Sequence, residues 1–262
     1  MAWLMGHEVW PQWVATEPPA VRVADLLSKP TRQAQYTISD PHGPIGSIWT
    51  SYLVDEQSIR RDDLIWMARF PLDIAPLRIT VNSVFTADGA LDEFDVLLEN
   101  PATRLPVKLH GERFHADFSF TLEHGPLVRA FKLPLTEGGL IAGLFNPLAE
   151  FRDLRVGQTW RMQVFNPIAA LTNVGSRFIS VLAEVNAEER INTGGWEGNC
   201  LVVEAGQTKA WVDANGEVRV QEIALPVIGN LRIVRQAAFD LEQRNTARKT
   251  SLGKKGIWTE AN

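Results

Sequence analysis

Two histidines lie close together in the middle of the sequence, His110 and His115, with Asp117 two residues further on. Imidazole and carboxylate groups are common ligands of transition-metal ions. The hairpin register expected for this region places Lys108 and Arg113 directly opposite the histidines, where their positive charges would repel a cation. We therefore expect a solvated sheet face here, with no metal ion.

Four acidic residues gather a little earlier, and such a group can bind calcium or act as paired carboxylates. The alternation of side chains along a strand divides them between two faces. We therefore expect that their carboxylates do not converge. The four residues are Asp92, Glu93, Asp95 and Glu99.

The single cysteine, Cys200, lies in the apolar run Asn199–Val203. A catalytic thiol needs a cationic neighbour or a partnering histidine, and no histidine is near it in the sequence. We therefore expect a buried structural cysteine. One cysteine also excludes a disulfide framework and a Cys-rich metal site.

Motifs that bind a cofactor or mark common catalysts are missing from the sequence. It contains no Gly-rich phosphate loop, no dinucleotide fingerprint and no Gly-x-Ser-x-Gly turn, and His7-Glu8 is not followed by a second zinc-binding histidine. We expect no cofactor and have no candidate catalytic residue.

Large aromatic side chains are the more informative feature, because curved sheets rich in them hold lipid tails and exposed aromatic rings stack on sugars. Most aromatic residues of the chain are nonetheless expected in the core. The candidates for contact with a ligand are Trp49, Trp66, Phe118, Phe120 and Trp211.

Composition limits the class of protein. The chain has 262 residues, of which 45% are hydrophobic, and a formal net charge of −5. The apolar fraction is that of a folded protein, and the mild acidity argues against binding of nucleic acid. Composition does not determine the oligomeric state.

The body of the chain has a hydrophobic period of two, typical of β-strands. We expect a mainly β fold, with a curved antiparallel sheet or half-barrel and a short helical insert around Leu140–Phe151. The expected strands are Ala34–Ser39, Ser47–Asp55, Leu64–Phe70, Arg78–Thr86, Leu91–Leu98, Pro106–His110, Phe114–Glu123, Leu127–Leu133, Thr159–Phe165, Arg177–Ala187, Asn199–Glu204, Lys209–Asp213, Val218–Ile223 and Leu231–Gln236.

The turn residues of the first expected hairpin determine its register. Asp88-Gly89 is typical of a two-residue type I′ turn. This loop pairs Val81 with Val96 and Ile79 with Leu98, which places apolar side chains on one face.

A second hairpin is expected at Gly111-Glu112, pairing Leu109 with Phe114. Its second strand places Phe118 and Phe120 on one apolar face, with polar residues on the other.

A third hairpin is expected at 214–216, with a three-residue loop and Gly216 in the left-handed conformation. This register places Val212 opposite Val218. It also places Trp211 opposite Arg219, as a cation–π pair on the outer face.

We divide the chain into an N-terminal segment, 1–30, a single β-rich domain, 31–240, and a basic tail, 241–262. Trp3, Trp10 and Trp13 in residues 1–15 permit three interpretations: a segment in a membrane interface, the end of a membrane helix, or a helix on the protein's own core. The basic tail is expected to be solvated and mobile.

Four short motifs rich in turn and aromatic residues occur in the second half of the chain: Gly157–Trp160, Val164–Pro167, Thr208–Asp213 and Asn215–Glu217. In these motifs the chain resembles a β-rich bacterial envelope domain found N-terminal to transglutaminase-like domains, and the half-barrels of lipoprotein carriers. The resemblance implies a place in the bacterial cell envelope, on the periplasmic face, with a membrane tether at the N-terminus. It also implies a binding or scaffolding role and supplies no catalytic residues.

We therefore expect a non-enzymatic envelope protein that binds an apolar ligand, a glycan or a protein partner. Two alternatives remain open. The chain is a structural subunit of a membrane-associated assembly, or it is a hydrolase or transferase whose site the sequence does not reveal.

Overall fold

The structure is a computed structural model, and it describes residues 33–55, 57–69, 76–87, 91–100, 106–115, 117–134, 140–142, 153–165, 178–225 and 229–250. These residues form fifteen β-strands and one short helix, so the expected mainly β fold is confirmed. The chain divides into two compact units, and each is described by itself. The boundaries at residues 30 and 240 stay predictions.

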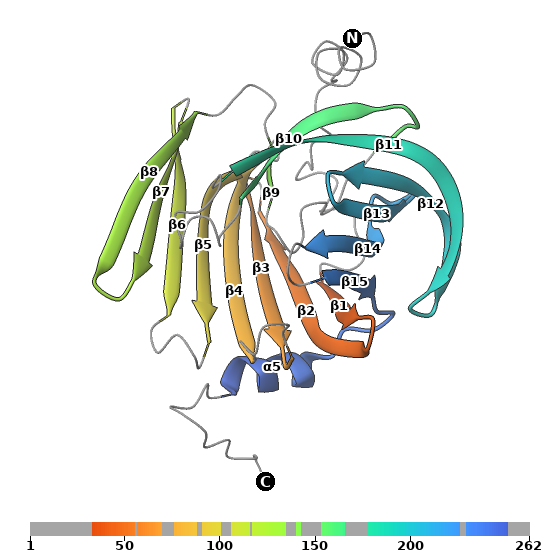
Figure 1. The fold of residues 1–262 in the computed structure, drawn as a ribbon, viewed down its shortest axis with the longest axis horizontal. Helices are drawn as coiled ribbons and strands as arrows, with labels where there is room; N and C mark the ends of the chain where they lie inside the picture. Colours follow the sequence, from red (N-terminus) through yellow and green to blue (C-terminus); the bar gives the residue numbers. More distant parts are fainter. Residues whose placement is uncertain are drawn as a thin grey trace. The chain divides into compact units, whose positions relative to one another are not determined.

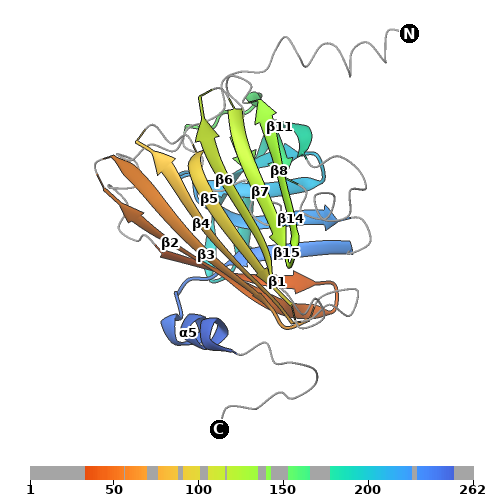
Figure 2. The same cartoon turned by 90° about the vertical axis from the view of Figure 1, so that its left-hand side faces the viewer.

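The larger unit comprises Arg22–Pro134 and Ala224–Asn262. Its strands are hydrogen-bonded in the order β8-β7-β6-β5-β4-β3-β2-β1-β15, and the pairs whose register is known are antiparallel (Figures 1 and 2). The elements are β1 (Gln33–Asp40), β2 (Gly43–Val54), β3 (Ser58–Met67), β4 (Leu77–Thr86), β5 (Leu91–Glu99), β6 (Val107–Phe114), β7 (Asp117–His124), β8 (Leu127–Pro134), β15 (Gly229–Arg235) and α5 (Leu241–Lys249).

The smaller unit comprises Met1–Val21 and Leu135–Ile223. Its strands follow the order β14-β13-β12-β11-β10-β9, and β11 is strongly curved (Figure 1). A register shift between Val185 and Ala187 interrupts the β11–β12 ladder, and such bulges increase the local twist. The strands are β9 (Leu140–Ala142), β10 (Thr159–Phe165), β11 (Phe178–Thr193), β12 (Trp196–Ala205), β13 (Thr208–Asp213) and β14 (Val218–Leu225).

The expected helical insert is wrong at its first residues. Leu140–Ala142 forms β9, which pairs with β10 in parallel. Three apolar residues in a row fit a strand as well as one helical face, so their spacing does not distinguish the two. Residues 143–152 of the predicted insert lie outside the described residues.

The register of the first hairpin is confirmed. Val81 pairs with Val96 and Ile79 with Leu98 in the β4–β5 ladder. A register shift near the turn, between Val84 and Phe85, leaves these pairs unaffected.

The second hairpin turns later than expected. β6 continues through Gly111 to Phe114, and the non-glycine residue at the turn, His115, has φ +55°. Gly111 therefore lies inside β6, opposite Phe120. A glycine suits this position because its missing side chain leaves room for aromatic rings. The face expected for the following strand is confirmed, since Phe118 and Phe120 are buried.

The third hairpin is confirmed only next to its loop. Val212 pairs with Val218, and Gly216 has φ +76°. A register shift after Trp211 then places that residue opposite Val220, so the expected pair with Arg219 is wrong. The Arg219 guanidinium instead lies 4.7 Å from the centre of the Trp196 ring.

Helix α5 packs on one face of the larger unit's sheet, which we call the α5 face. Trp49, Leu64 and Ala247 form a buried cluster there, with Trp66 and Phe239 against it. Figure 1 shows α5 beside the lower ends of β3 and β4. The first nine residues of the predicted mobile tail thus form a packed helix. Within the part of the chain that is described, none of the helices combines the length and the apolar character needed to span a membrane.

Candidate functional site

The face of the larger sheet opposite α5 carries most of that unit's apolar core, and we call it the core face. Strand alternation puts Ile48 of β2, Ile65 of β3 and Ile79 of β4 on this face in one register row. All three side chains are at most 5% exposed. The core face therefore excludes water over most of its area.

Four phenylalanine rings form a connected cluster on the core face, which we call the aromatic cluster. Phe94 of β5 stacks on Phe118 with ring centres 5.7 Å apart, and Phe118 lies 5.1 Å from Phe120. Phe120 stacks on Phe131 of β8 at 5.0 Å. Such offset contacts stabilise the sheet beyond the burial of the rings alone.

Burial is uneven over the middle strands of the core face. Core-face side chains such as Ile48 of β2 and Leu109 of β6 are almost completely buried, and so are Ile79 of β4 and Phe94 of β5. On β4 and β5 a group of mainly apolar side chains keeps part of its surface exposed. We call this group the β4–β5 strip, and it consists of Val81, Ser83, Phe85, Leu91, Val96 and Leu98.

One ion pair lies on the core face beside the strip. The Nε of Arg61 is 2.8 Å from Oδ2 of Asp63, and each side chain is only 10% exposed. The hydroxyl of Thr50 donates to Oδ1 of Asp63 at 2.5 Å, and the Arg61 guanidinium lies 5.8 Å from the centre of the Tyr52 ring.

This ion pair is well placed to meet a polar group bound at the strip. Arg61 is directly opposite Ser83, a member of the strip. Burying a charged pair among apolar side chains is costly, and such pairs need good partners. The arrangement can bind an apolar chain along β4–β5 and a polar group at its β3 side.

The structure does not bring the five predicted ligand-contact residues together. Phe118 and Phe120 belong to the aromatic cluster. Trp49 and Trp66 lie on the α5 face, and the indole N–H of the fully buried Trp49 has no hydrogen-bond partner in the described part of the chain. Trp211 is in the smaller unit.

Trp211 is held at the surface by polar neighbours. Its indole N–H donates to Oε2 of Glu189 at 2.7 Å, and Nζ of Lys209 lies 4.7 Å from the ring centre. The indole N–H and one face of the ring thus already have partners within the smaller unit.

Sequence reasoning missed Arg61, Asp63 and Ser83. The expected strand began at Leu64, because charged residues at 60–63 interrupt the apolar pattern. The signal was the alternation Ile59, Arg61, Asp63, Ile65, which places two charges on an apolar face.

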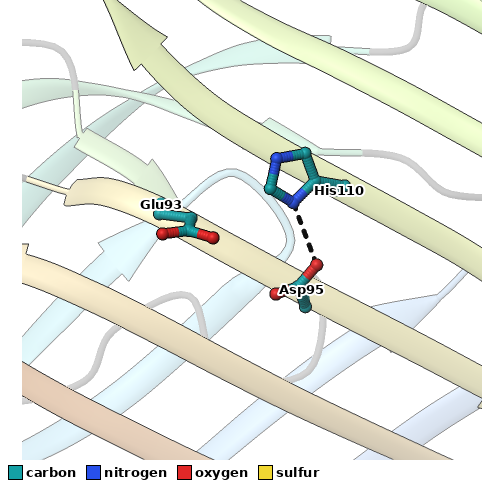
Figure 3. A group of neighbouring side chains, drawn as sticks. All are labelled: Glu93, Asp95 and His110. Carbon is teal, nitrogen blue, oxygen red and sulfur yellow. Dashed lines mark hydrogen bonds and ion pairs between the residues drawn. The ribbon is translucent and has the colours of Figure 1, made fainter.

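On the α5 face, the structure corrects two expectations. One was that Lys108 and Arg113 lie opposite the histidines, and the other was that the four acidic residues do not converge. Lys108 is opposite Leu97, and Arg113 is opposite Phe118, so neither faces a histidine. His110 is instead opposite Asp95, and their Nδ1 and Oδ1 atoms are 2.9 Å apart (Figure 3).

Two of the four acidic residues also converge there. Glu93 and Asp95 lie two positions apart in β5 and share a face with His110, and the ligand atoms of the three residues lie within 4.8 Å of one another. The hydrogen bond to Asp95 is the main reason why the pKa of His110 is raised. His115 is not in this group and packs its ring against Phe114.

Cys200 is buried as expected and is 1% exposed. Burial raises the pKa of its thiol to about 12, and the charge of Asp213 adds to this effect. The nucleophilic thiolate is therefore scarce at neutral pH, and the interpretation as a structural cysteine is confirmed.

Comparisons with known proteins give a likeness in structure. No protein-family model matches the chain, and no curated protein matches it. The structure is similar to the crystal structure of a β-barrel-like protein of domain of unknown function DUF1849 from Brucella abortus. The TM-score is 0.46 at 10% identity, over 79% of this chain and 97% of that chain.

Proposed function

We propose that this chain is a non-enzymatic protein of the bacterial envelope that binds an amphiphile with an acyl chain along the β4–β5 strip. The observation that carries the proposal is the partial exposure of a group of apolar side chains on one sheet face. The resemblance of the sequence to envelope domains supports the location.

An acyl chain fits the strip better than a glycan does. The strip itself consists of aliphatic and aromatic side chains, apart from Ser83. Each buried methylene contributes about 0.8 kcal/mol to binding, whereas a sugar needs hydrogen-bond partners along its length. The Arg61–Asp63 pair supplies donors and acceptors at one place only, as a polar head group requires.

The test compares two substitutions at neighbouring positions of β4. Ser83→Trp fills the strip from the core face, whereas Asn82→Trp adds the same ring on the α5 face. Native mass spectrometry of protein from envelope extract, and displacement of a fluorescent fatty acid, measure binding. We expect wild type and Asn82→Trp to retain a lipid, and Ser83→Trp to bind at least tenfold more weakly.

Other outcomes decide between the alternatives. Equal binding by both variants would place the ligand elsewhere, and an empty wild-type monomer would contradict the proposal. A specific oligomer without ligand would favour a structural subunit. That alternative has one observation in its favour: Val128 of β8 and Phe114 of β6 are each 60% exposed.

A further inference from the structure

A group of side chains outside the β4–β5 strip has the composition of a metal site. Glu93 and Asp95 come from β5, and His110 and Glu112 come from β6. In the antiparallel ladder, Asp95 is directly opposite His110, and Glu93 is directly opposite Glu112. All four side chains therefore project from the α5 face, on the far side of the sheet from the strip.

The charges of this group are not balanced by its neighbours in the sheet. The residues that flank the two pairs are Asn82 and Val84 on β4 and Ser119 and Thr121 on β7, all uncharged. Lys108 is the basic residue of β6 on this face, and its Nζ lies 4.0 Å from Oε2 of Glu123 instead. Two glutamates directly opposite each other destabilise a sheet, and a bound cation would reverse that effect.

We propose that Glu93, Asp95 and His110 bind one divalent transition-metal ion of the Zn²⁺ type. Their ligand atoms lie within 4.8 Å of one another, and Nδ1 of His110 is 2.9 Å from Oδ1 of Asp95 (Figure 3). Donor atoms of a tetrahedral zinc site are about 3.3 Å apart, given metal–ligand distances near 2.0–2.1 Å. Rotation of exposed side chains covers the difference, and water completes the coordination.

The imidazole determines which cations the site prefers. Carboxylates alone suit Ca²⁺ and Mg²⁺, whereas a nitrogen ligand favours Zn²⁺, Ni²⁺ or Cu²⁺. The second ring nitrogen of His110 faces Glu112, with Nε2 and Oε2 4.0 Å apart. A carboxylate behind a ligating histidine orients the ring and increases its basicity, so Glu112 is a positioning residue.

The experiment is a titration of the untagged 262-residue chain with Zn²⁺ at pH 7.5, followed by calorimetry, with Co²⁺ absorption as a second readout. We expect one ion per chain. His110→Ala and Glu93→Gln should each weaken binding at least tenfold, and Glu112→Gln should weaken it less. His115→Ala is the matched control, because it removes a neighbouring histidine outside the group and should leave binding unchanged.

Selectivity and folding distinguish a built site from general attraction. The substituted side chains lie at the surface, so the variants should fold and should unfold at a temperature no lower than that of the wild type. The proposal is overturned if wild type binds Zn²⁺ no better than His110→Ala, or if His115→Ala weakens binding equally. Binding of Ca²⁺ as tight as that of Zn²⁺ would also overturn it, because only an acidic surface would then be needed.

Discussion

The aromatic cluster depends on one residue that has no side chain. A Cβ atom on Gly111 would lie 2.5 Å from Cε1 of Phe94 and 2.8 Å from Cε1 of Phe118. Real Cβ atoms do not come so close to a ring, so any larger residue must displace both phenylalanines. The glycine of β6 thus allows rings from the two flanking strands, β5 and β7, to come into contact.

At this scale we expect Gly111→Ala to destabilise the fold by about 1–3 kcal/mol, the usual cost of overpacking a core. Lys108→Ala is the control, because it changes an exposed residue of the same strand. Urea unfolding of both variants measures the difference. Equal stability of the two variants would show that the rings move aside without cost.

At the scale of elements, the sequence predicts strands well and turns less well. The Val81–Val96 register is predicted correctly because turn chemistry and hydrophobic pattern favour the same pairing, while the predicted turn residues Asp88 and Gly89 lie outside the described residues. At Gly111 these two signals diverge: glycine favours turns, but here it lies inside β6 and leaves room for rings of the neighbouring strands β5 and β7. The convergence of His110 with Asp95 depends on the register between β5 and β6, which was not predicted from the sequence.

Helix α5 shows a second limit of prediction from the sequence, because the residues that hold the helix in place are distant from it in the sequence. Its N-cap is Asp240, whose backbone N–H donates to Gln35 of β1 at 2.7 Å. Arg78 of β4 donates to the carbonyl oxygens of Arg248 and Thr250 at 2.9 Å, and it also pairs with Glu99. A basic segment with few apolar residues gives no sign of these contacts.

We expect Arg78→Ala to release the C-terminal end of α5, because the guanidinium satisfies carbonyl groups that have no partner within the helix. The loss should be about 2–3 kcal/mol of local stability, typical of charged hydrogen bonds. Hydrogen exchange of amides 244–250 and the fluorescence of buried Trp49 measure the release. Lys249→Ala, on the exposed side of α5, should leave both unchanged; unaltered exchange in Arg78→Ala would contradict this role.

At the scale of the whole molecule, the proposed acyl ligand and the proposed envelope location both favour attachment of the protein to a membrane surface. An amphiphile with an acyl chain resides mainly in a bilayer, so a binding protein gains from being held at the membrane surface. Trp3, Trp10 and Trp13 are the residues whose chemistry suits that interface. Their role is independent of the β4–β5 strip and can be tested separately.

We expect the 262-residue chain to float with phosphatidylglycerol vesicles, and a Trp3, Trp10 and Trp13 to Ser variant to remain in solution. Indole rings partition into the interface through their apolar surface, so attachment should persist at high salt. Lys254→Ser with Lys255→Ser is the control for the basic tail, whose attraction to anionic lipid is screened by salt. If salt alone releases the wild type, the basic tail rather than the tryptophan segment makes the contact. If the triple variant still floats at high salt, the tryptophans pack on the protein itself, as the third interpretation of that segment holds.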